Sequence, residues 1–131
     1  MFEKLVYICS PYHGDMEQNR QNAVEYCEYA AQMGVISLAP HTIFTQYLDD
    51  DVPHQREVGL KMGLELLKRC DELWVFGPKI TEGMKREIIQ ANIERIPIRL
   101  LPDYSLHQEP PLEPDETVNI VEDISDMQLE L

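Results

Sequence analysis

The sequence predicts an α/β fold, namely a three-layer sandwich with a parallel, Rossmann- or flavodoxin-like sheet of about four to five strands. Short apolar runs recur along the chain, and each is followed by a longer segment with helical spacing of its apolar residues. Strand–helix–strand alternation with short links indicates parallel strands joined by right-handed crossovers. The runs are continuous rather than alternating, which is typical of strands covered on both faces.

The first strand is expected over residues 5–9, where the sequence reads LVYIC. A turn-forming segment follows, and a helix is expected over 16–33. Gly34 suits the end of this helix, because glycine readily adopts the left-handed conformation of a C-terminal cap. The run over 35–39 predicts a second strand that stops at Pro40.

The second half of the chain repeats this alternation. Residues 41–53 are expected to form a long polar and aromatic loop that ends in three aspartates. The remaining expected elements are a helix from 53 or 54 to about 69, a strand over 72–76, a helix over about 82–95 and a strand over 97–101.

The chain has 131 residues, enough for one domain with one sizeable core. We expect the α/β domain over residues 1–101 and an acidic, proline-rich extension over 102–131. The formal net charge is −13, but residues 103–131 hold nine acids and no lysine or arginine, so the preceding part carries a net charge of −4. Without a basic excess, binding to duplex nucleic acid or an anionic membrane is not expected.

The cysteines and the apolar runs indicate where the protein resides. Cys9, Cys27 and Cys70 are isolated and show no CxxC spacing, so neither a disulfide framework nor a zinc ribbon is expected. The apolar run after Lys4 is too short for a signal peptide, and no run approaches the roughly 20 apolar residues of a membrane span. We therefore expect a cytoplasmic protein with reduced thiols.

Glu87 is the leading candidate for a catalytic residue. It follows the strand over 72–76 and lies near the start of the next helix. In an open α/β sheet, ligands bind beyond the carboxyl ends of the strands, where helix N-termini present free N–H groups. Such a helix end is expected to lower the pKa of the carboxyl and keep it ionised. The alternative is a glutamate that only complements the helix dipole.

Three motifs follow one another along the chain. They are VYICSP at 6–11, Asp71 at the start of the third strand, and the pattern Thr81-x-Gly83-x-x-x-Glu87-x-x-x-Ala91. In this order and spacing they resemble the nucleoside 2-deoxyribosyltransferase superfamily, which includes the deoxynucleoside 5′-monophosphate N-glycosidases. The similarity spans about residues 5–101 and is greatest to an uncharacterised branch often borne by phages or prophages.

The resemblance implies an enzyme that hydrolyses or transfers at the N-glycosidic bond of a nucleoside or nucleotide, with Glu87 as the nucleophile. A carboxylate can stabilise or capture the oxocarbenium-like charge that forms at C1′. No organic cofactor and no metal are implied, because this chemistry needs only protein groups. The substrate-binding residues implied by the resemblance are Tyr7, Ser10, Tyr12, His13, Gly14, Asp71, Thr81, Gly83 and Met84.

One position departs from the family pattern. Family members usually carry an aspartate eight residues before Asp71, where this chain has Gly63. His13, His41 and His54 are candidate replacements, since a leaving base benefits from a general acid. The departure also leaves open a non-catalytic nucleotide-binding or sensing protein of the same fold. A structural or partner-binding protein is the third alternative.

The segment over 41–53 has two further interpretations. His41, the three aspartates at 49–51 and His54 are hard ligands but lack a recognised spacing, so a solvated loop is preferred and no metal site is expected. The same segment carries four large apolar side chains, which are expected to cover the cleft or contact a second subunit. They are Ile43, Phe44, Tyr47 and Leu48. Because the superfamily often completes its sites with a neighbouring chain, we expect a homo-oligomer, a dimer or higher.

Overall fold

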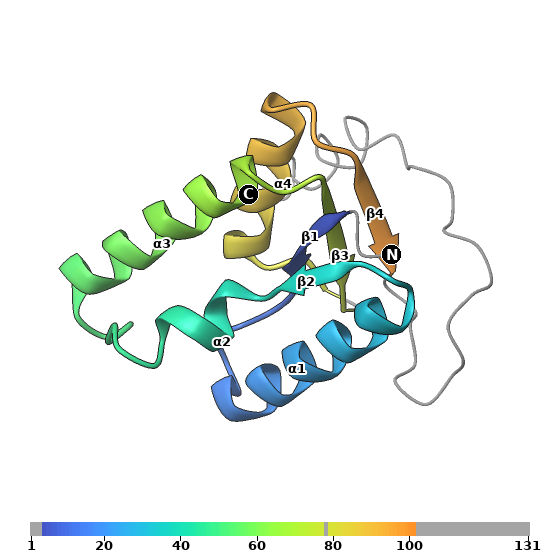
Figure 1. The fold of residues 1–131 in the computed structure, drawn as a ribbon. Helices are drawn as coiled ribbons and strands as arrows, with labels where there is room; N and C mark the ends of the chain where they lie inside the picture. The colour runs from blue at the N-terminus through green and yellow to red at the C-terminus, as the bar shows by residue number, and fades with distance from the viewer. Residues whose placement is uncertain (1–3, 78, 102–131) are drawn as a thin grey trace.

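The computed structural model describes residues 4–77 and 79–101, and in this part of the chain a parallel sheet lies between helices (Figure 1). The sheet has four strands, in the spatial order β2-β1-β3-β4. The strands are β1 (Leu5–Cys9), β2 (Ile36–Leu38), β3 (Glu72–Phe76) and β4 (Ile98–Leu101). All neighbouring strands are parallel, which confirms the flavodoxin-like α/β fold. The extension expected over 102–131 lies outside the described residues.

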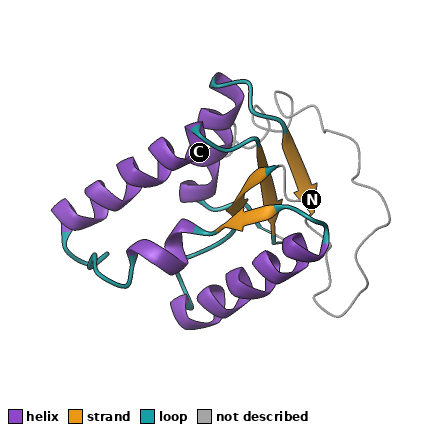
Figure 2. Ribbon diagram, in the orientation of Figure 1, coloured by secondary structure: helices purple, strands orange, loops and turns teal. Residues whose placement is uncertain are grey.

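Helices cover both faces of the sheet, as the three-layer prediction requires (Figure 2). The helices are α1 (Met16–Gln32), α2 (Pro40–Phe44), α3 (Pro53–Lys68) and α4 (Glu82–Ile93). Helix α1 packs on one face, whereas α3 and α4 pack on the other. In the described residues, none of these helices is long and apolar enough to cross a membrane.

The central strands have apolar side chains on both faces because each face meets a helix. On β1, Val6 and Ile8 belong to the cluster that α1 covers. Tyr7 and Cys9 point to the opposite face and belong to the cluster with α3 and α4. All four side chains are at most 1 % exposed. The alternation of a β-strand therefore sends Tyr7 and Cys9 to the same side as Glu87.

The main difference from the sequence-based expectation is α2, which occupies the start of the segment expected to be a loop. Pro40 stands in its first turn, where the missing N–H costs nothing, and the hydroxyl of Thr42 donates to the carbonyl of Ala39. A helix of five residues is too short to show a periodic apolar pattern. Helix α4 ends slightly before the expected boundary, since Arg95 adopts a left-handed conformation with φ of 59°.

The strand order places a ligand crevice at the carboxyl ends of β1 and β3. The chain leaves β1 toward α1 on one face and leaves β3 toward α4 on the other. The two connections therefore diverge between adjacent strands, and such a topological switch point is where open α/β sheets bind ligands.

Candidate functional site

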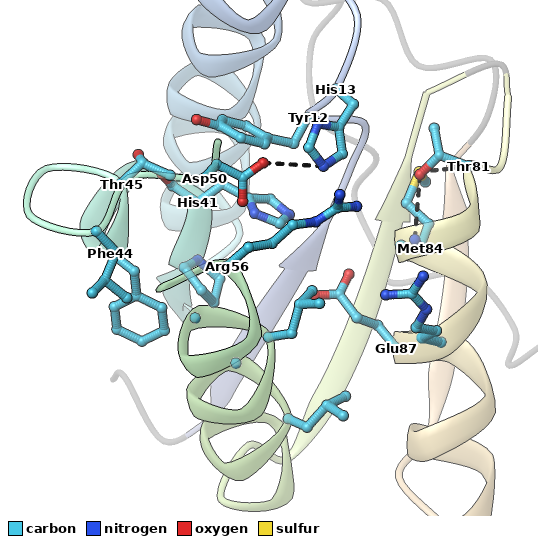
Figure 3. Close-up of a pocket in the computed structure, with 18 of the residues that line it drawn as sticks. Tyr12, His13, His41, Phe44, Thr45, Asp50, Arg56, Thr81, Met84 and Glu87 are labelled. Atoms are coloured by element: carbon cyan, nitrogen blue, oxygen red, sulfur yellow. Dashed lines mark hydrogen bonds and ion pairs between the residues drawn. The ribbon is translucent and has the colours of Figure 1, made fainter. Parts of the chain in front are cut away.

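A cavity of about 140 Å³ lies at this switch point (Figure 3). Its lining comes from β1 and the loop after it, from α2 and the loop before α3, from one face of α3, and from the start of α4. Of the residues expected to bind substrate, those that line it are Tyr7, Ser10, Tyr12, His13, Thr81, Gly83 and Met84, and Glu87 lines it too.

Glu87 is held by a hydrogen bond from the first strand. Its side chain leaves α4 in the second turn, is only 8 % exposed, and points into the cavity in Figure 3. The hydroxyl of Tyr7 donates to Oε2. Among the described residues, Oε1 has no hydrogen-bond partner. One carboxyl oxygen is therefore oriented by the protein, and the other is buried without a described partner in a side chain that lines the cavity.

The electrostatic expectation for Glu87 is wrong. Burial raises the pKa of this carboxyl from its ordinary value of 4.5 to about 7, although the hydrogen bond from Tyr7 and the nearby Cys9 thiol act in the opposite direction. The free N–H groups and most of the dipole effect are found in the first turn of a helix. Glu87 lies beyond the first turn of α4. The loss of hydration raises the pKa of Glu87 by more than the helix N-terminus lowers it, so both protonation states are populated near neutral pH.

Ser10 adds a second unpaired polar atom to the cavity. It follows the end of β1 and is 2 % exposed, and its Oγ has no hydrogen-bond partner in the described residues. A buried hydroxyl without a partner costs about 1–3 kcal/mol. Two such atoms in one cavity, Ser10 Oγ and Glu87 Oε1, indicate a place where a ligand supplies the missing hydrogen bonds.

On the side of the cavity opposite α4 lies a group that we call the histidine cluster, formed by Tyr12, His13, His41 and Asp50. His13 Nε2 lies 3.2 Å from Asp50 Oδ2, an ion pair drawn as a dashed line in Figure 3. The rings of Tyr12 and His41 stack with centroids 4.9 Å apart. Burial, followed by the nearby charge of His13, lowers the pKa of His41.

Helix α4 begins at the edge of the cavity. Thr81 is its N-cap, and Thr81 Oγ1 accepts a hydrogen bond of 3.3 Å from the backbone N–H of Met84. The Thr81 side chain thus fixes where the helix starts, and this in turn places Glu87 two turns along the cavity wall.

Two of the expected substrate contacts are not brought to the site. Asp71 precedes β3 at the opposite end of the sheet, and its carboxylate accepts a hydrogen bond of 2.8 Å from the backbone N–H of Leu5. Gly14 has a φ of +100° and serves the turn into α1, but it does not line the cavity. We therefore leave Asp71 and Gly14 out of the proposed site.

The structure gives a reason for the glycine at position 63. A Cβ atom built there would lie 3.2 Å from the hydroxyl oxygen of Tyr7, which is tighter than ordinary van der Waals contact. Tyr7 is 1 % exposed and cannot easily move aside. The Tyr7 hydroxyl therefore occupies the space that a side chain on α3 would need.

Two arginines in the site were not identified from the sequence. Arg56 on α3 and Arg86 on α4 both line the cavity, and neither forms an ion pair within the described residues. The signal that could have found Arg56 is its spacing from Gly59 and Gly63, which places all three on one helical face. Glycines on such a face indicate close approach of a neighbouring group.

Within the described residues, His54 and the acidic run at 49–51 are not part of a group that could hold a metal ion. His54 is exposed at the start of α3 and does not line the cavity. In residues 4–77 and 79–101, no three His, Cys, Asp or Glu side chains come close enough together to hold a metal ion.

Fold and site together define a flavodoxin-like α/β protein with a buried carboxyl in its switch-point cavity. A family model described as a domain of unknown function (DUF7768) matches residues 4–101, and the chain belongs to this family. No curated protein matches the chain.

A solved structure with the same fold is that of 2-deoxyribosyltransferase from the psychrotolerant bacterium Bacillus psychrosaccharolyticus. The two proteins share 17 % sequence identity with a TM-score of 0.64, over 93 % of this chain and 80 % of that chain. At this level of identity the similarity establishes the fold.

The raised pKa of Glu87 predicts a pH-dependent stability. Because the folded state binds this proton more tightly than the unfolded state, the free energy of unfolding falls as pH rises from 4.5 to about 7. For this one group the loss is about 3 kcal/mol. Glu87→Gln keeps the shape and removes the charge, so its stability advantage over the wild type should grow by about 3 kcal/mol across this range in chemical denaturation.

Glu28→Gln is the matched control, because Glu28 is exposed on α1, and it should leave the pH dependence unchanged. Parallel stability curves for the wild type and Glu87→Gln would mean that the Glu87 carboxyl titrates at its ordinary pH.

Proposed function

We propose that the protein cleaves the N-glycosidic bond of a nucleoside or nucleotide, by hydrolysis or by transfer to a second base, with Glu87 as the nucleophile. The observation that supports the proposal is that the two oxygens of this buried carboxyl have different surroundings. Tyr7 donates to Oε2, which orients the group, while Oε1 is buried without a described partner in a side chain that lines the cavity. The shared fold with a protein named a 2-deoxyribosyltransferase supports it.

The environment of Glu87 suits this chemistry in its ionised form. Breaking the bond between C1′ and the base develops positive charge on the sugar, which a carboxylate in a poorly hydrated cavity stabilises strongly. The same desolvation raises the pKa of Glu87 to about 7, so the reactive carboxylate forms as the pH passes neutrality. The raised pKa of Tyr7, caused first by burial and then by the charge of Glu87, keeps its hydroxyl protonated as a donor.

The two arginines favour a substrate that carries a phosphate. Arg56 and Arg86 extend from α3 and α4, the two helices on either side of the cavity, and Figure 3 shows Arg56 reaching into it. A guanidinium group binds phosphate oxygens through paired, charge-assisted hydrogen bonds. We therefore infer that a nucleoside 5′-monophosphate is bound in preference to the nucleoside.

A second candidate function is non-catalytic binding or sensing of a nucleotide. It is favoured by Gly63, because α3 contributes no carboxylate there and the Tyr7 hydroxyl fills the space. In that case the cavity and its arginines would bind the ligand, and Glu87 would serve as a hydrogen-bond partner only.

The two functions differ in base release. We expect the wild-type protein to release free base from at least one member of a panel of nucleosides and 5′-monophosphates. The released base is measured by chromatography. Glu87→Gln should reduce turnover by about three orders of magnitude or more, since it removes the nucleophile and keeps the shape. Glu28→Gln should retain full turnover.

Thermal stabilisation by a nucleotide without any base release would favour the sensing protein. Neither stabilisation nor release with any panel member would favour a structural or partner-binding protein.

The preference for a phosphate can be tested by replacing each of the two arginines. Arg56→Ala and Arg86→Ala should each raise KM for the best 5′-monophosphate by about 10- to 100-fold, because each variant loses one charge-assisted hydrogen bond to the phosphate. The corresponding nucleoside should be affected less than about threefold. Arg69→Ala, at the far end of α3, is the control and should change neither KM. Equal losses for nucleoside and monophosphate would contradict a phosphate contact.

We also propose that the protein is a homo-oligomer with α2 and the loop after it near the subunit interface. Phe44 and Leu48 turn toward the cavity, whereas Ile43 and Tyr47 are 40 % and 62 % exposed. Large apolar side chains exposed on one short segment are typical of a surface that another protein covers.

Replacing Ile43 and Tyr47 together by serine should therefore weaken self-association without emptying the cavity, as measured by sedimentation velocity at tens of micromolar protein. Ile93→Ser is the control, since Ile93 is 66 % exposed near the end of α4, away from this segment. A monomeric wild-type protein at these concentrations would contradict the oligomer.

A further inference from the structure

The histidine cluster contains a histidine and an aspartate arranged as in acid–base sites. His13 Nε2 lies 3.2 Å from Asp50 Oδ2, so this carboxylate orients the ring. The second ring nitrogen, Nδ1, is not used by this pair. Both residues line the cavity that contains Glu87, and Figure 3 shows them on the side opposite α4.

The position of His13 is fixed more firmly than that of an ordinary exposed loop residue. The side-chain amide of Asn19 donates to the backbone carbonyls of Tyr12 and His13, at 2.9 Å and 3.0 Å. The buried ring of Tyr12 contacts the His13 ring edge-on, with centroids 5.5 Å apart, and its other neighbour is the stacked ring of His41. Ring and carboxylate contacts thus restrain the imidazole, although its side chain is 55 % exposed.

Other titratable groups in the cavity lining are less suited to donate a proton. The proton of Tyr7 is engaged with Glu87, and burial raises the pKa of this phenol well above its usual range. Burial lowers the pKa of His41, which favours its neutral form. Glu82 is paired with Lys85 at 3.6 Å, and a phenol such as Tyr12 is a weaker acid than an imidazolium.

We propose that His13, oriented by Asp50, is the general acid that protonates the departing base. The proposal rests on the function proposed above. When the carboxylate of Glu87 forms a bond to C1′, the C1′–N bond breaks and its electron pair moves to the base. The imidazolium of His13 gives its proton to a ring nitrogen or carbonyl oxygen of the base, which leaves neutral, and His13 becomes a neutral imidazole.

The return step restores both residues. A water molecule, or a second base in a transferase, attacks C1′ and releases the Glu87 carboxylate, while the imidazole of His13 accepts the proton that the nucleophile loses. Turnover therefore requires an ionised Glu87 and a protonated His13 at the same time, and kcat/KM should fall on both sides of its optimum pH. The charged and titratable groups that share this part of the cavity wall with His13 are Asp50, His41 and Arg56.

The test compares leaving groups, because a base that leaves without protonation needs no general acid. Each active substrate is paired with such an analogue, the N7-methylated form of a purine 5′-monophosphate or the 5-nitro form of a pyrimidine 5′-monophosphate. For the parent substrate, His13→Gln should lower kcat by about 100-fold or more, and Asp50→Asn by about tenfold. For the activated analogue, both variants should stay within about threefold of the wild type.

His54→Gln is the matched control, since His54 is exposed and outside the cavity, and it should behave as the wild type with both substrates. Equal losses of His13→Gln on parent and analogue, or no loss on either, would overturn the general-acid role while leaving the N-glycosidic activity in place. Absence of base release by the wild-type protein from every substrate and analogue would instead overturn the proposed function, and this inference with it.

Discussion

The site depends on one buried hydrogen bond, from the hydroxyl of Tyr7 to the carboxyl of Glu87. It joins the central strand β1 to α4 beneath the cavity, and α3 approaches so closely that a Cβ atom at position 63 would lie 3.2 Å from the hydroxyl oxygen. Three elements far apart in the sequence therefore meet at one contact. A shift of any of them would change the orientation of the carboxyl, the shape of the cavity wall, or both.

This contact is made at a cost to stability above neutral pH. The carboxyl is deprived of water, receives one hydrogen bond, and keeps one oxygen without a described partner, while Ser10 adds a second unpaired atom nearby. A protein selected only for stability would replace such a group by an apolar side chain. Groups of this kind concentrate where a ligand completes the hydrogen bonds and where chemistry requires a carboxylate with little solvation.

Around the Tyr7–Glu87 hydrogen bond, different parts of the cavity wall carry different kinds of side chain. Helices α3 and α4 present Arg56 and Arg86, which suit an anionic group, and the histidine cluster on another part of the cavity wall suits proton transfer. A nucleotide has this same division into a charged phosphate, a sugar with the reactive C1′, and a base that must be protonated to leave. In the proposed function, one cavity would contact these three parts of one substrate.

The sequence by itself determined the fold class and nearly all element boundaries, because continuous apolar strands, periodic helices and turn-forming links are local patterns. It also singled out Glu87 and the residues after β1, since parallel strands bring the ends of β1 and β3 to one edge. Tertiary structure alone decided the rest. The raised pKa of Glu87 follows from burial by other elements, Asp71 lies at the end of the sheet that faces away from the cavity, and Asp50 reaches the cavity through the path of its loop. Hydration and contacts across the fold are properties of packing in three dimensions, and no local pattern encodes them.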